Sequence, residues 1–334
     1  MDINKIYNED CQEGVKRISD ASIDCILTDP PYLYLKGQKL ERPFNEKELF
    51  TEFKRILKPT GFVVLFGRGT SFYRWNTILS DLGLEFKEEI VWDKKYSTSP
   101  LMRLSRIHET ISFYTKKNGV ILKTKVPYLE MKRYDLDSIL QDMNRLKCVL
   151  KNPTSLNNVL EFIENNRKFI DKKYVDKYTV SIQTGVNQVD RSTAVLSAIE
   201  NGMNEKSIIR CDYTKVNRPN NAAVRHDAPT GDRNVDVIQC ISCGMNEKSI
   251  IREGRDHYKT IHPTQKPVRL LERLLALVTR PGDVVLDPFS GSGSTAVACI
   301  NNGRKFIGFE IDKEYYDASV ERLKKALSEP KLAM

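Results

Sequence analysis

The sequence predicts an α/β protein built on one mostly parallel sheet, with helices on both faces and a long insertion near the middle of the chain. Two observations predict the sheet: buried-strand patterns alternate with helical patterns in the first third of the 334 residues, and the same alternation returns in the last third. A third observation predicts the insertion, because residues 118–257 show no sustained hydrophobic period apart from two helical patterns. We therefore expect residues 1–117 and 258–334 to form one domain together.

The elements of this domain follow from the spacing of its apolar residues. Short continuous apolar runs predict buried strands, and apolar residues three and four positions apart predict helices. In chain order we expect a short helix opened by Asn8-Glu9-Asp10-Cys11, a strand at 23–28, a helix at 46–57 ended by Pro59-Thr60-Gly61, a strand at 62–66, a helix at 72–82 ended by Gly83, strands at 89–92 and 109–114, a helix at 268–278, a strand at 284–286, a helix at 294–301, a strand at 306–309 and a helix at 313–327.

The insertion carries helical patterns at 135–150 and 156–172 and a direct repeat. Gly-Met-Asn-Glu-Lys-Ser-Ile-Ile-Arg stands at 202–210 and again at 244–252. Two short copies do not make a solenoid. They are either equivalent hairpin or loop elements on a binding face or a duplication without structural meaning, and the sequence does not decide between the two.

The composition is that of a globular protein with a modest excess of positive charge. The net charge is +9, and about 25 Lys and Arg against about 18 Asp and Glu put most of it between residues 116 and 261. This excess suits nucleic acid or another polyanion, although a solvated surface would carry it too. The sequence has no apolar run near the roughly 18 residues that span a membrane, and its polar N-terminus does not read as a signal peptide. Seven scattered cysteines indicate reduced thiols, so we expect a cytoplasmic protein.

An acid, two prolines and an aromatic residue follow the strand at 23–28 directly. The Asp29 carboxylate is displayed at the strand end, because a residue before proline adopts extended geometry. Pro30 has no N–H and a fixed φ, which leaves its carbonyl as a second acceptor, and Pro31 follows it. Tyr32 offers a flat face to a base taken out of its stack. These groups suit methyl transfer to the amino group of a nucleic-acid base. Cys25, inside the strand, is expected to be core rather than a nucleophile.

A glycine loop follows the strand at 284–286 and leads into a helix. Gly291 and Gly293 allow close approach of the backbone to a ligand, and the free N–H groups at a helix start favour an anionic group. Glu310 stands about 20 residues further on, where an acid binds ribose hydroxyls in dinucleotide folds. A tight turn that packs helix on strand is the alternative. A Rossmann dehydrogenase is disfavoured because residue 296 is alanine, and a P-loop because Gly-Lys-Ser/Thr is absent.

Together these motifs resemble those of the permuted (beta-class) S-adenosylmethionine-dependent DNA amino-methyltransferases, in which the catalytic motif precedes the cofactor motif. Asp29-Pro30-Pro31-Tyr32 resembles the catalytic D-P-P-Y of that family, and Asp287 to Gly293 resembles its F-x-G-x-G cofactor loop. His262 to Pro267 resembles its H-P-T-Q-K-P segment, and residues 90–94 and 108–114 resemble two later strands. The resemblance covers about residues 1–117 and 258–327. It implies a circularly permuted, Rossmann-like methyltransferase sheet with a target-recognition region inserted at 118–257.

The resemblance also implies a role for each matching residue. Lys266 would hold the methionine carboxylate, and Glu310 the ribose hydroxyls. Asp10 would meet the adenine amino group of the cofactor, although capping its own helix is the plainer role. The implied catalytic residues are Asp29, Pro30, Pro31 and Tyr32, and the implied S-adenosylmethionine-binding residues are Asp10, Cys11, Asp29, Lys266, Asp287, Phe289, Ser290, Gly291, Ser292, Gly293, Thr295, Glu310 and Ile311.

The family resemblance implies methylation of duplex DNA with base flipping. In the family, an aspartate before Pro-Pro usually accompanies methylation of adenine N6, and a serine usually accompanies methylation of cytosine N4. Asp29 therefore favours adenine, with N4-cytosine as the alternative. An RNA or protein methyltransferase and a catalytically silent DNA-binding protein are further alternatives. Trp92 forms either another pocket wall or part of the core.

Several features of the insertion stay open. We assign no metal site, because Cys240-Ile-Ser-Cys243 with Cys211, His226 or His257 is a weak zinc pattern. The sequence also does not decide whether a homodimer forms, whether a cognate restriction endonuclease is a partner, or whether the host cell is bacterial or phage-infected. The candidates for base readout in the insertion and just after it are Arg210, Arg225, Arg233, Arg252 and Arg255.

Overall fold

The computed structural model describes residues 1–32, 42–94, 107–133, 135–147, 245–254, 261–262 and 264–328. The chain divides into two compact units. The larger unit, called the sheet unit below, comprises Met1–Met102, Arg106–Thr124 and Lys248–Met334, and the smaller unit comprises Arg103–Ser105 and Lys125–Glu247.

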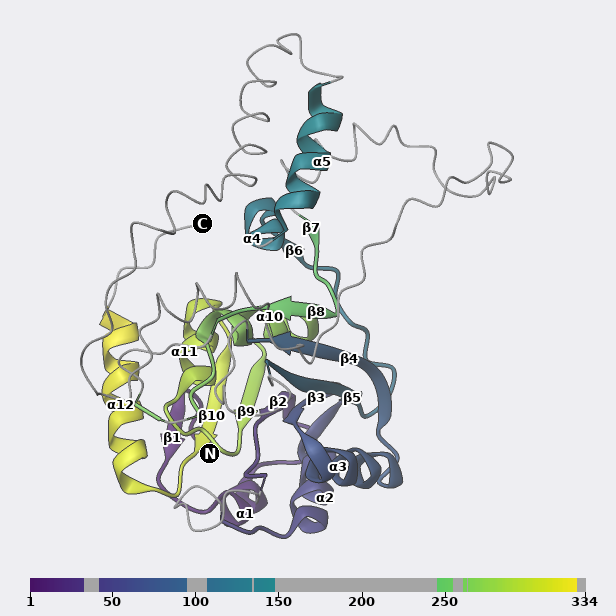
Figure 1. Cartoon of the computed structure of the whole chain (residues 1–334). Helices are drawn as coiled ribbons and strands as arrows, with labels where there is room; N and C mark the ends of the chain where they lie inside the picture. The colour runs from purple at the N-terminus through teal and green to yellow at the C-terminus, as the bar shows by residue number, and fades with distance from the viewer. Residues whose placement is uncertain are drawn as a thin grey trace, which may run out of the picture. The chain divides into compact units, whose positions relative to one another are not determined.

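An eight-stranded sheet forms the centre of the sheet unit (Figure 1). Its strand order is β1-β10-β9-β2-β3-β5-β4-β8. The strands β1, β10, β9, β2 and β3 are parallel to one another, β5 is antiparallel to both β3 and β4, and β8 is parallel to β4. The strands are β1 (Lys5–Tyr7), β2 (Ile23–Thr28), β3 (Leu57–Gly67), β4 (Glu85–Asp93), β5 (His108–Thr115), β8 (Ile250–Arg252), β9 (Val284–Asp287) and β10 (Lys305–Phe309).

The two ends of the chain meet inside this sheet, as the alternation of elements predicts. Cys25 and Ile26 of β2 pair with Val285 and Leu286 of β9, and β1 pairs with β10 at one edge. Segments that lie far apart in sequence are therefore neighbouring strands. Because β2 and β9 are parallel, their carboxyl ends lie at the same edge of the sheet.

Helices cover both faces of the sheet. Alternate residues of β3 belong to different core clusters: Val63 and Leu65 pack with residues of α1, α2 and α3, whereas Val64 and Phe66 pack with residues of α10, α11 and α12. Successive side chains of a strand point to opposite faces, so the two clusters lie on opposite sides of the sheet. The helices are α1 (Cys11–Gly14), α2 (Glu46–Ile56), α3 (Gly69–Asp81), α10 (Val268–Val278), α11 (Ser294–Asn301) and α12 (Lys313–Ser328).

The elements expected from the sequence are present in the sheet unit, several with the expected bounds. The strand Ile23–Thr28 and the helices Val268–Val278 and Ser294–Asn301 match the expected ranges. The sequence misses β1 and β8, which have three residues each and are too short to show a period. Because β8 joins this sheet, the chain returns to the sheet unit at Lys248 rather than at 258.

One boundary in the first third is wrong. Pro59-Thr60-Gly61 does not end the helix; α2 ends at Ile56, and these residues lie inside β3. Leu57 already pairs with Ile23, and the register then shifts between Ile23 and Cys25. Proline is tolerated at such an irregularity because a ladder hydrogen bond is already missing there.

The smaller unit contains four described elements: β6 (Lys125–Val126), α4 (Tyr128–Lys132), α5 (Leu136–Lys147) and β7 (Met245–Asn246). The Tyr128 hydroxyl donates to Asp142 at 2.8 Å, and Lys132 pairs with the same carboxylate at 3.0 Å, which ties α4 to α5. The helix expected at 135–150 is α5, whereas the one expected at 156–172 lies outside the described residues.

The second copy of the repeat contributes to both units. Met245–Asn246 forms β7, which pairs with β6, and Ile250–Arg252 forms β8 in the large sheet. The first copy, at 202–210, lies outside the described residues. In its described part the second copy is therefore two short strands in different sheets rather than one hairpin.

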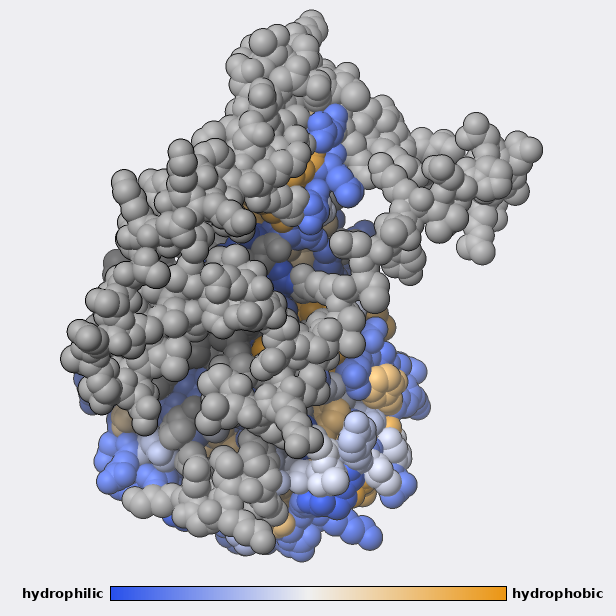
Figure 2. All heavy atoms as spheres, viewed as in Figure 1, coloured by the Kyte–Doolittle hydropathy of each residue, from blue (hydrophilic) through white to orange (hydrophobic). Residues whose placement is uncertain are grey.

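The described surface is mostly hydrophilic on the face drawn in Figure 2, with small hydrophobic spots. Large exposed apolar side chains such as Tyr73 and Phe86 are scattered over different elements. Among the described residues, no helix is both long enough and apolar enough to cross a membrane.

Candidate active site

A cavity of about 240 Å³ opens where β2, β9 and β10 end. All of the residues that the sequence analysis assigns to catalysis and cofactor binding line this cavity, with the exception of Gly293. Gly293 instead adopts φ +72° directly before α11, where it forms the turn into the helix. The sheet thus brings two motifs from opposite ends of the chain to one cavity, although their roles remain predictions.

The Asp29 carboxylate stands at the carboxyl end of β2 and binds two partners. The Tyr32 hydroxyl donates to Asp29 Oδ1 at 2.5 Å, and the Lys266 ammonium pairs with Oδ2. Tyr32 is itself held in place, because Ser71 Oγ donates to its carbonyl oxygen at 2.9 Å and its ring packs on Trp75 at 5.8 Å between centroids. The Asp29 carboxylate is therefore held in place by a tyrosine and a lysine.

A row of buried charges continues from Asp29 into the core. Lys266 Nζ also lies 3.5 Å from Glu109 Oε2, and Lys94 Nζ lies 3.1 Å from Glu109 Oε1. The Lys94, Glu109 and Lys266 side chains are 8% exposed or less, which leaves the charges little water to screen them. The order is positive, negative, positive, negative, so each charge adjoins opposite ones. The Trp92 ring lies within 6.0 Å of both ammonium groups.

The glycine loop runs from β9 to α11 and is held close to β10. Ser290 N donates to Phe309 O at 2.9 Å, and a Cβ on Gly308 would come within 2.3 Å of Ser290 Oγ, so a side chain there would displace the Ser290 hydroxyl. Gly291 has φ +49°, a left-handed conformation that favours glycine. The loop backbone therefore lies directly against the cavity.

Glu310 has both carboxylate oxygens fixed by backbone donors. Gly291 N donates to Oε2 and Asp312 N donates to Oε1, each at 2.8 Å. Burial raises the pKa of Glu310, while these two hydrogen bonds lower it in part. Ile311 beside it is 44% exposed and lines the same cavity. A fixed acid next to an exposed apolar side chain suits a sugar joined to a flat base.

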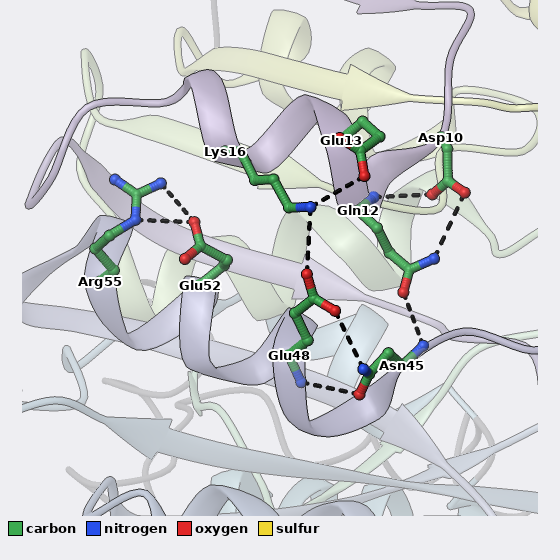
Figure 3. Close-up of polar contacts among 8 residues, drawn as sticks. All are labelled: Asp10, Gln12, Glu13, Lys16, Asn45, Glu48, Glu52 and Arg55. Atoms are coloured by element: carbon green, nitrogen blue, oxygen red, sulfur yellow. Dashed lines mark hydrogen bonds and ion pairs between the residues drawn. The ribbon is translucent and has the colours of Figure 1, made fainter.

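Asp10 caps α1 and is part of a wider polar network (Figure 3). Its Oδ1 accepts from Gln12 N at 2.9 Å, and Gln12 Oε1 accepts in turn from Asn45 N at 2.8 Å. Asn45 caps α2 by accepting from Glu48 N at 3.2 Å. The plain role expected for Asp10 is therefore present, and the network joins the starts of α1 and α2 at the cavity wall.

Asp287 ends β9 in a buried position. Burial raises the pKa of its carboxyl, and the nearby Asp29 and Glu310 carboxylates raise it further. Hydrogen bonds from the Thr295 hydroxyl and Phe289 N lower the pKa in part, and the net value is about 7. Asp287 therefore titrates near neutral pH in the folded protein.

The raised pKa predicts a pH-dependent cost at Asp287. Its ordinary pKa is 3.8, so between about pH 4 and pH 7 the folded state keeps a proton that the unfolded chain has lost, and stability falls as the pH rises. Asp287→Asn cannot ionise. The free energy of unfolding of this variant minus that of the unmodified protein should therefore increase from pH 5 to pH 8, by on the order of a few kcal/mol. Urea unfolding followed by tryptophan fluorescence measures this, and a difference independent of pH would contradict it.

Other expected residues receive definite places. Of the two roles left open for Trp92, the core role holds: its side chain is fully buried and its indole N–H donates to Glu253 O at 2.8 Å. Cys25 is core, and burial raises the pKa of its thiol far above the ordinary value. Arg252, a candidate for base readout, lies in β8 of the large sheet and forms an ion pair with Asp93. The remaining readout candidates and all five residues of the weak zinc pattern lie outside the described residues: Arg210, Arg225, Arg233, Arg255, Cys211, His226, Cys240, Cys243 and His257.

Sequence reasoning missed several residues of the cavity. Phe44 packs on Phe289 at 5.3 Å and on Trp75 at 6.3 Å, so it closes one wall beside the glycine loop. Glu109 and His262 lie within the recognised motifs, but the sequence assigns neither of them a role. None of these residues carries a local signal, because what matters is which distant segment each one faces.

Comparison with known proteins decides the family. A family model described as DNA methylase matches residues 23–321 of the chain. The chain belongs to the DNA methylase family. The family uses S-adenosylmethionine, which agrees with the resemblance found from the two motifs, and it does not by itself distinguish N6-adenine from N4-cytosine.

Two curated relatives of this DNA methylase illustrate the similarity. The type II methyltransferase M.BglII of Bacillus subtilis is 25% identical over 336 residues, which is 96% of this chain and 69% of M.BglII. The DNA adenine methyltransferase YhdJ of Escherichia coli (strain K12) is 52% identical over 68 residues, which is 20% of this chain and 23% of YhdJ.

Two solved structures are similar to this DNA methylase. PvuII DNA methyltransferase (cytosine-N4-specific) matches with a TM-score of 0.51 and 13% identity, covering 97% of this chain and 89% of that chain. The M1.HpyAVI-SAM complex has a TM-score of 0.48 and 21% identity over 96% of this chain and 98% of that chain. The match to the PvuII enzyme supports the expected Rossmann-like methyltransferase fold.

Proposed function

We propose that the chain is a site-specific DNA methyltransferase that transfers a methyl group from S-adenosylmethionine to the N6 amine of adenine in duplex DNA. One observation carries the proposal: the Asp29-to-Tyr32 motif and the glycine loop line one cavity at the ends of adjacent parallel strands. A methyl acceptor bound at the first motif would then lie beside a donor bound at the second.

The residues of the cavity fit the proposed cofactor. Glu310 keeps lone pairs for two ribose hydroxyls while its oxygens hold the two backbone donors. Gly291 has no side chain where the loop lines the cavity, and Lys266 supplies a cation for a carboxylate. When bound, the cofactor supplies a reactive methyl group on a sulfonium centre.

The protein's task is then to prepare the acceptor nitrogen. The lone pair of an exocyclic amine is delocalised into its ring, which makes the amine a poor nucleophile. The Asp29 carboxylate and the Pro30 carbonyl would accept the two amine hydrogens and favour a pyramidal nitrogen aimed at the methyl group. The amine must leave the duplex to reach them, and the Tyr32 ring would stack on the flipped base.

Adenine is favoured over cytosine by the residue before Pro-Pro. Asp29 is the aspartate that usually accompanies N6-adenine in the family, and one relative with 52% local identity is by name a DNA adenine methyltransferase. N4-cytosine is the second candidate, since one solved structure with a similar fold is by name cytosine-N4-specific.

The smaller unit is proposed to recognise the target sequence, because it occupies the place of the predicted insertion and that insertion has a net positive charge. The similarity to the type II methyltransferase M.BglII makes a restriction-modification system in a bacterial cytoplasm the proposed setting.

The proposed function predicts one methylated nucleoside. Unmethylated genomic DNA treated with the protein and labelled S-adenosylmethionine is digested to nucleosides and separated by mass spectrometry. We expect labelled N6-methyldeoxyadenosine, and single-molecule sequencing then gives its sequence context. Labelled N4-methyldeoxycytidine would overturn the choice of base, whereas label in tRNA or peptide but not in duplex DNA would overturn the choice of substrate.

A further inference from the structure

His262 lies at the cavity with the hydrogen-bonding state of its ring fixed by its neighbours. Thr264 N lies 3.3 Å from Nδ1 and donates to it, and Thr264 Oγ1 lies 3.0 Å from the same nitrogen. A backbone N–H can only donate, so Nδ1 must be the acceptor and a neutral ring must carry its hydrogen on Nε2.

The ring is also fixed in position. It packs edge-on against Tyr315 with 4.4 Å between centroids, and Gln265 N donates to the His262 carbonyl at 3.1 Å, which closes the local turn. A ring held by a neighbour on one side and a turn on the other presents its free edge in one direction.

That free edge faces the glycine loop. A Cβ placed on Gly291 would lie 3.4, 3.5 and 3.6 Å from Cδ2, Nε2 and Cε1 of His262. Both residues line the cavity, and no hydrogen bond from Nε2 is found among the described residues. The Nε2–H group is therefore a donor fixed beside the glycine loop. Gly291 N of the same loop donates to Glu310.

The charge state of the ring agrees with this role. Burial and the Lys266 ammonium lower the pKa of His262, while the Asp29 and Asp312 carboxylates raise it, and the result is about 4. The imidazole is therefore neutral at working pH. Unlike Lys266, it offers a hydrogen bond without a charge.

We propose that His262 is a cofactor-binding residue whose Nε2–H donates to an oxygen of S-adenosylmethionine lying over Gly291. This rests on the proposed function. The acceptor is an oxygen of either the ribose or the methionine carboxylate, because the loop separates Glu310, which suits the ribose, from Lys266, which suits the carboxylate.

Ligand binding to His262 variants distinguishes a role as hydrogen-bond donor from a role in packing alone. His262→Phe keeps a flat ring against Tyr315 and removes the donor, whereas His262→Gln restores an N–H. Isothermal titration calorimetry is run with S-adenosylmethionine and with 5′-methylthioadenosine, which has the ribose but no carboxylate. His262→Phe should raise the Kd for S-adenosylmethionine about 3- to 10-fold, and His262→Gln should recover part of the loss.

The two ligands identify the acceptor oxygen. An equal loss for both ligands assigns the ribose, and a loss confined to S-adenosylmethionine assigns the carboxylate. His108→Phe makes the same change at a half-buried histidine that does not line this cavity, and it should leave both Kd values unchanged. An unchanged Kd in His262→Phe overturns the proposal, while an unmodified protein that binds neither ligand would overturn the proposed function instead.

The tautomer gives a test that needs no ligand. The chain has four histidines, and ¹⁵N-labelled imidazole spectra compared with those of His262→Phe identify the His262 signals. We expect protonation on Nε2 alone from pH 6 to pH 9. Protonation on Nδ1, or a charged ring at pH 6, would overturn the proposal whatever the binding data.

Discussion

Asp29→Asn is expected to abolish DNA methylation while leaving S-adenosylmethionine bound. The variant keeps the shape of the side chain and an oxygen that can accept from the Tyr32 hydroxyl, but it loses the negative charge facing the amine. Removing one preorganised electrostatic partner of a transition state costs about 10²- to 10³-fold in kcat. Initial rates of methyl transfer to duplex DNA, measured with labelled cofactor, should fall by at least about 10²-fold.

Cofactor binding should survive this change because of how Lys266 is shared. Its ammonium pairs with both Asp29 and Glu109, so these two carboxylates share one positive charge. Removing the Asp29 charge frees Lys266 for an incoming carboxylate. The Kd for S-adenosylmethionine should therefore stay the same or decrease, even as turnover disappears.

A matched control excludes a general effect of losing an acid. Asp20→Asn makes the same substitution at a side chain that is 77% exposed and pairs with Arg55 at the surface. Exposed pairs contribute little, about 0–1 kcal/mol, so Asp20→Asn should methylate DNA at the normal rate. If Asp29→Asn retained a rate within a few-fold of that control, the assigned mechanism would be wrong.

The sequence predicts the parts of this fold that have long, regular patterns. The helix Val268–Val278 and the strand Ile23–Thr28 are found with the expected bounds because most of their buried positions carry apolar residues. The sequence also predicts that the two ends form one domain, since each end alone lacks a complete sheet. In the structure, β2 from the first third pairs with β9 from the last third.

Features decided by distant partners could not be predicted. The end of α2 is set by Leu57, which joins β3 against Ile23 in spite of the Pro-Thr-Gly sequence that follows. The pairing of Lys266 with Asp29 and Glu109 joins three segments of the chain. A local pattern identifies each of these residues as polar, but burial and partners depend on the whole sheet.

Glu109→Gln is expected to destabilise the sheet unit strongly. Glu109 lies between two ammonium groups, and its side chain and those of Lys94 and Lys266 are nearly inaccessible to solvent. Removing one member of a buried ion pair costs about 3–5 kcal/mol, because the remaining charge has lost its compensation in a medium of low dielectric constant. Urea unfolding should therefore show a decrease in the free energy of unfolding of about 3 kcal/mol or more.

Tryptophan fluorescence is a suitable signal for this measurement. Both tryptophans of the chain, Trp75 and Trp92, are fully buried in the sheet unit, so their emission follows the unfolding of that unit. Glu85→Gln serves as the control, because Glu85 is 51% exposed, lies on the neighbouring strand β4 and pairs with Lys87 at 2.9 Å. Its effect should be below about 1 kcal/mol.

A double variant tests whether charge, rather than shape, causes the loss at Glu109. If the cost comes from the buried Lys94 charge, then adding Lys94→Met to Glu109→Gln removes that charge and should recover part of the lost stability. The coupling energy between the two positions would then be on the order of 1–3 kcal/mol. Additive losses in the double variant would show that the two side chains act independently, and the row of alternating charges would then have no role in holding Lys266 at the cavity.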